Sequence, residues 1–368
     1  MADNKVKEIY NYRQSIWLDF IDRAIMRTGK LERMIEDDGL RGVTSNPAIF
    51  EKAFASSADY DEDISARADS ELSDEQLFYE LAISDIRKAA DLFYGVYNGK
   101  VVGADGFVSL EVSPELALET EDTISQALDL WQRVDRKNVM IKIPGTKPCL
   151  PAIRKAIAAG LNVNVTLLFG LERYEAVTDA IITGLEDRLA KGEPVSGIAS
   201  VASFFLSRID ILVDPMLEEK GLKDLKGETA IALAKEAYAI YKRVFSGERW
   251  QQLADQGAKP QRLLWASTGV KDTTVKDTKY VEALIGPDTV NTAPLDTINA
   301  FRDHGIVNPT LESGLETAGN TLRQVKNAGI DLEAVSQQLE TEGIQKFKEP
   351  YQKMLQAIAA KRKKKKEL

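Results

Sequence analysis

The feature that most constrains the fold is a regular alternation of short apolar runs with longer amphipathic segments. Strands that alternate with helices are joined by crossovers and form a parallel sheet. Eight such units predict a closed (β/α)8 barrel, the TIM-barrel fold. The eight apolar runs are Ser15–Asp19, Gly39–Asn46, Gly106–Val112, Val139–Ile143, Asn162–Leu168, Gly197–Ser203, Arg262–Ser267 and Asp288–Ala293.

The segments between these runs have apolar residues at helical spacing and predict the outer helices of the barrel. A long, mostly helical insertion covers residues 47–103, and two more helices are predicted at Asp331–Glu340 and Gly343–Ala360. We therefore expect a single barrel domain over residues 1–360, with extra helices in the insertion and at the C-terminal end. The other predicted helices are Asp74–Tyr97, Thr120–Arg136, Leu150–Ala159, Leu171–Ala190, Phe204–Glu219, Glu228–Ala254, Thr278–Ile285 and Leu295–Asp303.

The charge distribution argues against a nucleic-acid-binding protein. The 368-residue chain has a net charge of −9, and removing the six positive charges of Lys361–Lys366 leaves −15 for the rest. An acidic body repels the phosphate backbone that dominates nucleic-acid affinity, although it can still contain a small basic pocket for a phosphorylated metabolite. Six like charges in a row predict that the tail, residues 361–368, is solvated and disordered, with weak binding to acidic surfaces as the alternative.

The scarcity of cysteine and histidine limits which disulfides, metal sites and acid–base groups the chain can have. Cys149 is the only cysteine and His304 the only histidine, which excludes an internal disulfide and any Cys- or His-cluster metal site. Acid–base chemistry then falls to Asp, Glu, Lys, Tyr or bound water. The charged N-terminus has no apolar signal core and no run approaches 18 apolar residues, which predicts a cytoplasmic protein that does not enter membranes. The oligomeric state, monomer or homodimer, stays open.

Lys142 interrupts the apolar run Val139–Ile143 near its C-terminal end. A buried ammonium is costly unless it is paired or neutralised. Such a lysine therefore either pairs with a carboxylate or acts as a neutral amine, the form that makes a Schiff base with a carbonyl substrate. The run by itself favours the salt-bridged lysine, because most buried lysines are paired.

Polar or ionisable residues lie at the C-terminal ends of seven of the eight runs, where barrel enzymes carry their active sites. For a single serine, a helix cap or a loop hydrogen bond is the simpler explanation. Asp19, Glu111 and Lys142 instead favour an active site, because three charges converging on one barrel mouth tune one another's pKa values. The full set is Asp19, Asn46, Glu111, Lys142, Asn164, Thr166, Ser203 and Ser267.

Five segments lie at or near these ends: GVTSNPAIF at Gly42–Phe50, SLEVS at Ser109–Ser113, IKIP at Ile141–Pro144, NVNVTLLF at Asn162–Phe169 and WAS at Trp265–Ser267. These segments resemble the motifs of transaldolases, and the chain length resembles the longer bacterial branch of that family. The resemblance runs in order from Ser15 to about Thr292. It implies a class I aldolase-type barrel without metal or organic cofactor. It also implies transfer of a dihydroxyacetone unit between sugar phosphates in the non-oxidative pentose phosphate pathway, with sedoheptulose 7-phosphate and fructose 6-phosphate as donors and glyceraldehyde 3-phosphate and erythrose 4-phosphate as acceptors.

Carried onto this sequence, the resemblance implies catalytic roles for four residues. Lys142 matches the Schiff-base lysine, whose amine attacks the ketose carbonyl. Asp19 matches the acid/base that takes the C4 hydroxyl proton when the C3–C4 bond breaks. Glu111 matches the carboxylate that, with Thr166 and a held water, moves protons while the carbinolamine forms and dehydrates.

The same resemblance implies substrate contacts for residues around these four. Arg208 matches a phosphate-binding arginine. Without the resemblance, a surface ion pair of Arg208 with Asp210 or Asp214 would be the favoured interpretation. The remaining matches are two amides that orient the three-carbon enamine, a serine that hydrogen-bonds the substrate and a phenylalanine that shapes the same wall, namely Asn46, Asn164, Ser203 and Phe205.

The sequence departs from the family pattern at one phosphate-binding position. Many family members follow the serine of the seventh strand, here Ser267, with an arginine two residues later. This chain has Gly269 at that position, and Lys271 is the candidate that supplies the charge instead.

Two other functions stay open on the sequence alone. A fructose-6-phosphate aldolase-like enzyme uses the same lysine but releases free dihydroxyacetone. A non-catalytic sugar-phosphate-binding barrel would be favoured if Lys142, Asp19 or Glu111 were replaced, and none of them is.

Overall fold

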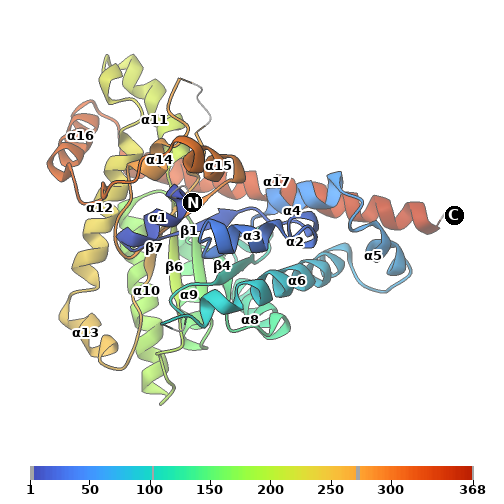
Figure 1. Ribbon diagram of the computed structural model, residues 1–368. Coiled ribbons are helices and arrows are strands. Elements are labelled where there is room, and N and C mark those ends of the chain that lie inside the picture. The colour runs from blue at the N-terminus through green and yellow to red at the C-terminus, as the bar shows by residue number, and fades with distance from the viewer. Residues whose placement is uncertain (1–3, 102, 271–273, 367–368) are drawn as a thin grey trace.

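The structure of the chain, a computed structural model, describes residues 4–101, 103–270 and 274–366. Eight parallel strands form a closed barrel in chain order, with β8 paired to β1 and helices arranged around the outside (Figure 1). The predicted (β/α)8 fold is thereby confirmed. The strands are β1 (Gln14–Asp19), β2 (Gly42–Thr44), β3 (Phe107–Glu111), β4 (Val139–Pro144), β5 (Val163–Leu168), β6 (Ser200–Phe205), β7 (Arg262–Ala266) and β8 (Thr289–Ala293).

All eight predicted runs form strands whose ends differ from the prediction by a few residues. The difference that affects the site is in β6, which ends at Phe205 rather than at Ser203. The ladder between β6 and β7 continues through Phe204 and Phe205, so the next helix begins at Ser207 rather than at Phe204. Alternate residues of a strand point to the same face. Ser203 and Phe205 therefore lie on the same face of β6, toward the barrel mouth.

Glycine is required at the start of β2 by a close approach inside the barrel. A Cβ atom on Gly42 would lie 2.6 Å from the ring of Trp17, and real Cβ contacts are never that short. Trp17 is fully buried on β1 and fills the barrel below Asp19. The first glycine of the GVTSNP segment is thus explained by packing rather than by chemistry.

The outer helices follow the predicted segments, with two of them split. Asp74–Tyr97 divides into two helices at Phe93, and Glu228–Ala254 divides near Gly247. Short 3-10 helices lie at Ile9–Tyr12, Pro114–Leu116, Lys147–Cys149 and Lys223–Leu225. The α-helices are α1 (Lys5–Glu8), α2 (Arg23–Arg27), α3 (Lys30–Asp37), α4 (Pro47–Ser56), α5 (Asp61–Ala66), α6 (Asp74–Leu92), α7 (Tyr94–Tyr97), α8 (Thr120–Val134), α9 (Leu150–Ala158), α10 (Leu171–Ala190), α11 (Ser207–Glu219), α12 (Thr229–Val244), α13 (Glu248–Ala254), α14 (Lys279–Glu282), α15 (Leu295–His304), α16 (Leu315–Asn327) and α17 (Leu332–Lys366).

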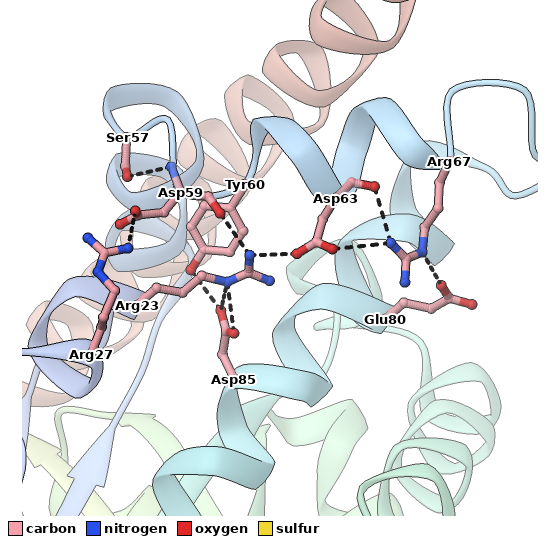
Figure 2. A network of polar contacts seen from close by, with 9 residues as sticks. All are labelled: Arg23, Arg27, Ser57, Asp59, Tyr60, Asp63, Arg67, Glu80 and Asp85. Atoms are coloured by element: carbon pink, nitrogen blue, oxygen red, sulfur yellow. Dashed lines mark hydrogen bonds and ion pairs between the residues drawn. The ribbon is translucent and has the colours of Figure 1, made fainter.

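A network of polar contacts fixes the insertion after β2 to the helix that follows β1 (Figure 2). Arg23 of α2 forms ion pairs with Asp85 of α6 at 3.0 Å and with Asp63 of α5 at 2.6 Å. The Tyr60 hydroxyl donates a hydrogen bond to the buried Asp85 carboxylate at 2.8 Å. Because a buried charge is tolerated only when it is paired and hydrogen-bonded, the network defines one arrangement of α2, α5 and α6 next to the strand end that carries Asp19.

The C-terminal region differs from its prediction. The two predicted helices, Asp331–Glu340 and Gly343–Ala360, are parts of the single helix α17, which packs against α4 and α5 (Figure 1). Gly343 does not end the helix, and its lack of a side chain lets α17 approach the barrel. A Cβ atom there would lie 3.0 Å from Leu167 Cδ2 and 3.6 Å from Arg208 Nη1.

The first residues of the predicted disordered tail are helical in the structure. Helix α17 continues to Lys366, and Lys361 bonds the Phe54 carbonyl at 2.7 Å and the Asp61 carboxylate at 2.6 Å. Arg362 pairs with Asp74 at 2.8 Å. Like charges in a row indicate disorder only while they have no partners, and the acidic insertion provides partners here. Residues 367 and 368 lie outside the described part of the chain.

Candidate active site

A cavity of about 160 Å³ opens at the C-terminal ends of the strands. It contains most of the residues predicted from the strand ends, and it also contains residues from α17, more than 300 positions away from β1 in the sequence. Ten of its fourteen lining residues are polar or charged, which suits a polar ligand. The lining residues are Asp19, Thr44, Asn46, Ala48, Lys142, Thr166, Ser203, Phe205, Arg208, Ala266, Ser267, Thr292, Lys346 and Phe347.

Lys142 is both paired and exposed to this cavity. It lies opposite Glu111 in the register of β3 and β4, and its Nζ is 3.3 Å from Glu111 Oε2. The Nζ also donates a hydrogen bond to the Ser45 carbonyl at 3.0 Å, and the side chain is only 5% exposed. The two interpretations of a buried lysine are therefore compatible, because the salt-bridged lysine is also the one that reaches the cavity.

Glu111 lies beside Lys142 rather than on the cavity wall. Burial raises the pKa of its carboxyl to about 7, an effect that Lys142 partly offsets and Asp19 increases. Neither carboxylate oxygen has a hydrogen-bond partner within the described residues. A carboxyl group with this pKa can hold or release a proton near neutral pH, as general acid–base chemistry requires.

Asp19 lines the cavity at the end of β1. The Thr44 hydroxyl donates a hydrogen bond to Asp19 Oδ1 at 2.7 Å, and Thr44 in turn contacts Thr292 at 2.7 Å. Burial raises the pKa of the Asp19 carboxyl, although the positive charges of Lys142 and Arg208 and the Thr44 hydrogen bond oppose the shift. The two carboxyl groups next to Lys142 thus have different environments, which suits different roles.

Two predicted amides are already engaged in hydrogen bonds. Asn164 donates to Ser109 Oγ at 3.0 Å and accepts from Ser203 Oγ at 2.7 Å, and it lies behind the cavity wall. Asn46 lines the cavity, and its side chain also caps α4 by accepting from the Ile49 amide at 3.1 Å. The structure therefore brings Asn46 and Ser203 to the cavity directly, and Asn164 through its bond to Ser203.

Thr166 lines the cavity from β5, where the strand is irregular. Its hydroxyl is fully buried and has no hydrogen-bond partner in the part of the chain that the structure describes. The next residue, Leu167, has a φ of 60°, and the register of β5 with β6 shifts between Val165 and Leu168. A leucine in the left-handed region is rare and strained, and such residues concentrate at functional sites.

Arg208, the second residue of α11, lines the cavity close to two aromatic rings. Its Cζ lies 5.2 Å from the ring centroid of Phe205 and 5.8 Å from that of Phe347. Burial lowers its pKa, while Asp19 and Glu111 oppose the change. Nη1 is buried without a hydrogen-bond partner among the described residues, which leaves a guanidinium donor available to an anionic ligand.

The alternative surface pair for Arg208 is wrong, because both carboxylates act elsewhere. Asp210 accepts hydrogen bonds from the Ala230 amide at 2.8 Å and the Tyr280 hydroxyl at 2.7 Å. Asp214 accepts from the Gly227 amide at 2.8 Å. These bonds connect α11 with the segments that follow it and orient the helix that carries Arg208.

Ser267 lines the cavity at the end of β7, with a φ of 55°. Its hydroxyl is 2.7 Å from that of Ser207, the first residue of α11. The predicted phosphate-binding Lys271 lies outside the described residues.

Sequence reasoning missed the contribution of α17. Phe347 is 4% exposed and its ring centroid lies 5.6 Å from Lys142 Nζ, and Lys346 lines the cavity next to it. Both belong to a helix that reads as an ordinary amphipathic surface helix, so no motif in the sequence distinguishes them. Thr44 and Thr292 were also missed, although their places at strand ends were a usable signal.

A larger cavity, of about 440 Å³, opens at the other end of the barrel, where the strands begin. Its buried charges are already paired, since Asp105 interacts with Arg41 at 2.9 Å and with Arg262 at 3.4 Å. Barrel enzymes carry their chemistry at the C-terminal ends of the strands. The smaller cavity, lined by Lys142 and Asp19, is therefore the candidate active site.

Residues 4–101, 103–270 and 274–366 contain neither a membrane-spanning helix nor a metal-binding cluster. None of the helices there combines the length and apolar character needed to cross a membrane. No three His, Cys, Asp or Glu side chains gather there in an arrangement that could hold a metal ion.

Comparison with known proteins places the chain among relatives along its entire barrel. A family model described as transaldolase/fructose-6-phosphate aldolase matches residues 16–358. The chain is 46% identical to Transaldolase 2 of Nostoc punctiforme, over 97% of both chains. It is 45% identical to Transaldolase of Trichodesmium erythraeum over 99% of both chains, and 47% identical to Transaldolase of Saccharopolyspora erythraea over 94% of both.

Proposed function

Since the chain belongs to the transaldolase/fructose-6-phosphate aldolase family, we propose that it is a transaldolase of the non-oxidative pentose phosphate pathway. It transfers a dihydroxyacetone unit from sedoheptulose 7-phosphate to glyceraldehyde 3-phosphate, giving erythrose 4-phosphate and fructose 6-phosphate. The observation that carries the proposal is the position of Lys142, which lines the mouth cavity together with Asp19 while it pairs with Glu111.

The first step is formation of an imine. The Nζ of Lys142, once its proton has passed to Glu111, attacks the ketose carbonyl carbon to give a carbinolamine, which then loses water. Loss of water needs a proton on the departing oxygen, and Glu111, whose pKa is about 7, provides it. The Thr166 hydroxyl, buried on the cavity wall and without a protein partner in the described structure, relays the proton with a water molecule.

The second step breaks the C3–C4 bond. Asp19 takes the proton of the C4 hydroxyl, the aldehyde leaves, and the bonding electrons move toward the iminium nitrogen to form an enamine. Thr44 orients the Asp19 carboxylate through its 2.7 Å hydrogen bond. Asn46 contacts the enamine, and Asn164 orients Ser203, which contacts the substrate. The acceptor aldehyde then reacts with the enamine by the same steps in reverse.

The phosphate of the sugar binds at Arg208. Support comes from the buried Nη1, which has no partner among the described residues, and from the neighbouring hydroxyl groups of Ser267 and Ser207. A guanidinium binds a phosphate through two parallel hydrogen bonds, which fixes the orientation of the sugar as well as its affinity. Phe205 and Phe347 form the wall on either side of this group.

An assay with fructose 6-phosphate as the single substrate tests the proposal. A transaldolase keeps the enamine until an acceptor arrives, so it releases about one glyceraldehyde 3-phosphate per active site and then stops. Addition of erythrose 4-phosphate should restore turnover. Continuous release of glyceraldehyde 3-phosphate and free dihydroxyacetone would instead identify a fructose-6-phosphate aldolase. No release at all would identify a non-catalytic sugar-phosphate-binding barrel.

A further inference from the structure

A third cation lines the mouth cavity besides Lys142 and Arg208. Lys346 extends from the middle of α17, next to Phe347, whose ring centroid lies 5.8 Å from Arg208 Cζ. Helix α17 can come this close because Gly343, one turn earlier, lies against Leu167 and Arg208 without a side chain. The C-terminal helix therefore supplies part of the cavity wall and one of its positive charges.

The charge of Lys346 is only weakly compensated. Its Nζ lies 3.1 Å from Glu342 Oε2, with the side chains 55% and 40% exposed. Exposed pairs of this kind contribute little to stability. The charge of Glu342 also acts on Arg208. One half-exposed carboxylate thus faces two cations, and a phosphate dianion, with twice the charge and three acceptor oxygens, can compete for both.

We propose that Lys346 is a phosphate-binding residue of this site, acting with Arg208 and in competition with Glu342. The inference rests on the proposed function for the identity of the ligand, a sugar phosphate. The planar guanidinium of Arg208 can donate two parallel hydrogen bonds to the phosphate, whereas the ammonium of Lys346 is a compact charge that can bind it in several orientations. The position two residues after Ser267 is Gly269 and provides no charge. Lys346 instead supplies its charge from α17, a different element of the fold.

Direct binding of sorbitol 6-phosphate, measured by calorimetry, tests the inference. This polyol has no carbonyl group and cannot form an imine, so its affinity reports the phosphate contacts without the chemistry. Lys346→Met should weaken binding roughly tenfold or more, since a hydrogen bond to a charged group is lost. Glu342→Gln should strengthen binding several-fold, because a competing negative charge is removed.

The matched control is Lys348→Met, which removes the same charge from the same helix. Lys348 pairs with Glu115 at 3.0 Å and does not line the cavity, so its replacement should leave the affinity unchanged. Equal affinities of the Lys346 and Lys348 variants would overturn the proposed role of Lys346. Weakening by Lys271→Met in place of Lys346→Met would overturn it as well. Unchanged or weaker binding in the Glu342 variant would overturn the competition.

Kinetics separate this inference from the proposed function. In the transfer assay, Lys346→Met should raise the KM for fructose 6-phosphate far more than the KM for unphosphorylated fructose. If the wild-type protein transfers no dihydroxyacetone but the Lys346 variant still loses sorbitol 6-phosphate binding, the proposed function fails and the inference stands. If transfer occurs and the Lys346 variant binds like the wild type, the inference alone fails.

Discussion

Replacement of Glu111 by glutamine separates proton transfer from the shape of the site. The wild-type carboxyl has a pKa raised from 4.5 to about 7 by burial. A shift of this size favours the protonated form by roughly 3 kcal/mol. The protonated and ionised forms are then present in similar amounts near neutral pH. A group that first donates a proton to a departing hydroxyl and later takes one back works best under that condition.

Glutamine keeps the size of the side chain but cannot titrate. We expect Glu111→Gln to slow imine formation by on the order of 10²–10⁴. The wild-type rate should change with pH around an inflection at about 7, and the variant should lack that inflection. Rapid mixing with fructose 6-phosphate, followed by borohydride quenching at a series of pH values, measures the rate as modified Lys142. An inflection that persists in the glutamine variant would refute the assignment of the titrating group to Glu111.

The same raised pKa has a consequence for stability. Because the folded-state pKa lies above the unfolded value, the stability associated with the protonated carboxyl is complete below about pH 4.5 and is lost as pH rises through about 7. The wild type should therefore lose roughly 3 kcal/mol relative to Glu111→Gln across this interval. Urea denaturation of both proteins at either end of the interval measures it. A pH-independent difference between them would contradict a raised pKa.

Four further substitutions test other residues. Asp19→Ala should still form the imine but fail to cleave it, so that mass spectrometry of the protein mixed with fructose 6-phosphate detects a six-carbon adduct; its absence from this variant would reverse the roles of the carboxylates. Arg208→Ala should raise the KM of phosphorylated sugars far more than that of unphosphorylated dihydroxyacetone, and equal losses would argue against a phosphate contact. Arg23→Ala should lower the free energy of unfolding by about 3 kcal/mol, because Asp85 stays buried without its charged partner. Arg27→Ala breaks an exposed pair and should lower it by less than about 1 kcal/mol. Similar losses for the two arginine variants would contradict this account.

The barrel was predictable because its pattern is local and repeated. Each strand is covered by helices on one side and by the barrel core on the other, so it appears in the sequence as a short apolar run. Residues that interrupt such a run carry information for the same reason. Lys142 could be singled out as a charge in an otherwise buried strand, and the β3–β4 register then places Glu111 directly beside it.

Contacts that depend on the final packing could not be predicted in this way. Lys346 and Phe347 reach the cavity because α17 crosses the barrel mouth, and nothing in their local sequence specifies that crossing. Asn164 was expected on the substrate but is held between two serines, since a strand pattern gives the face of a residue and not its hydrogen-bond partners. Lys361 was expected in a disordered tail because its partners lie some 300 residues earlier in the chain.

Borohydride reduction in the presence of fructose 6-phosphate is the most direct test of the central claim, that Lys142 forms the imine. Peptide mass spectrometry should find a reduced three-carbon remnant on the peptide that contains Lys142. The Lys142→Arg variant should show no adduct and no turnover, because a guanidinium stays protonated and cannot attack a carbonyl. A remnant on a different lysine, or no remnant while the wild-type protein turns over, would contradict the account.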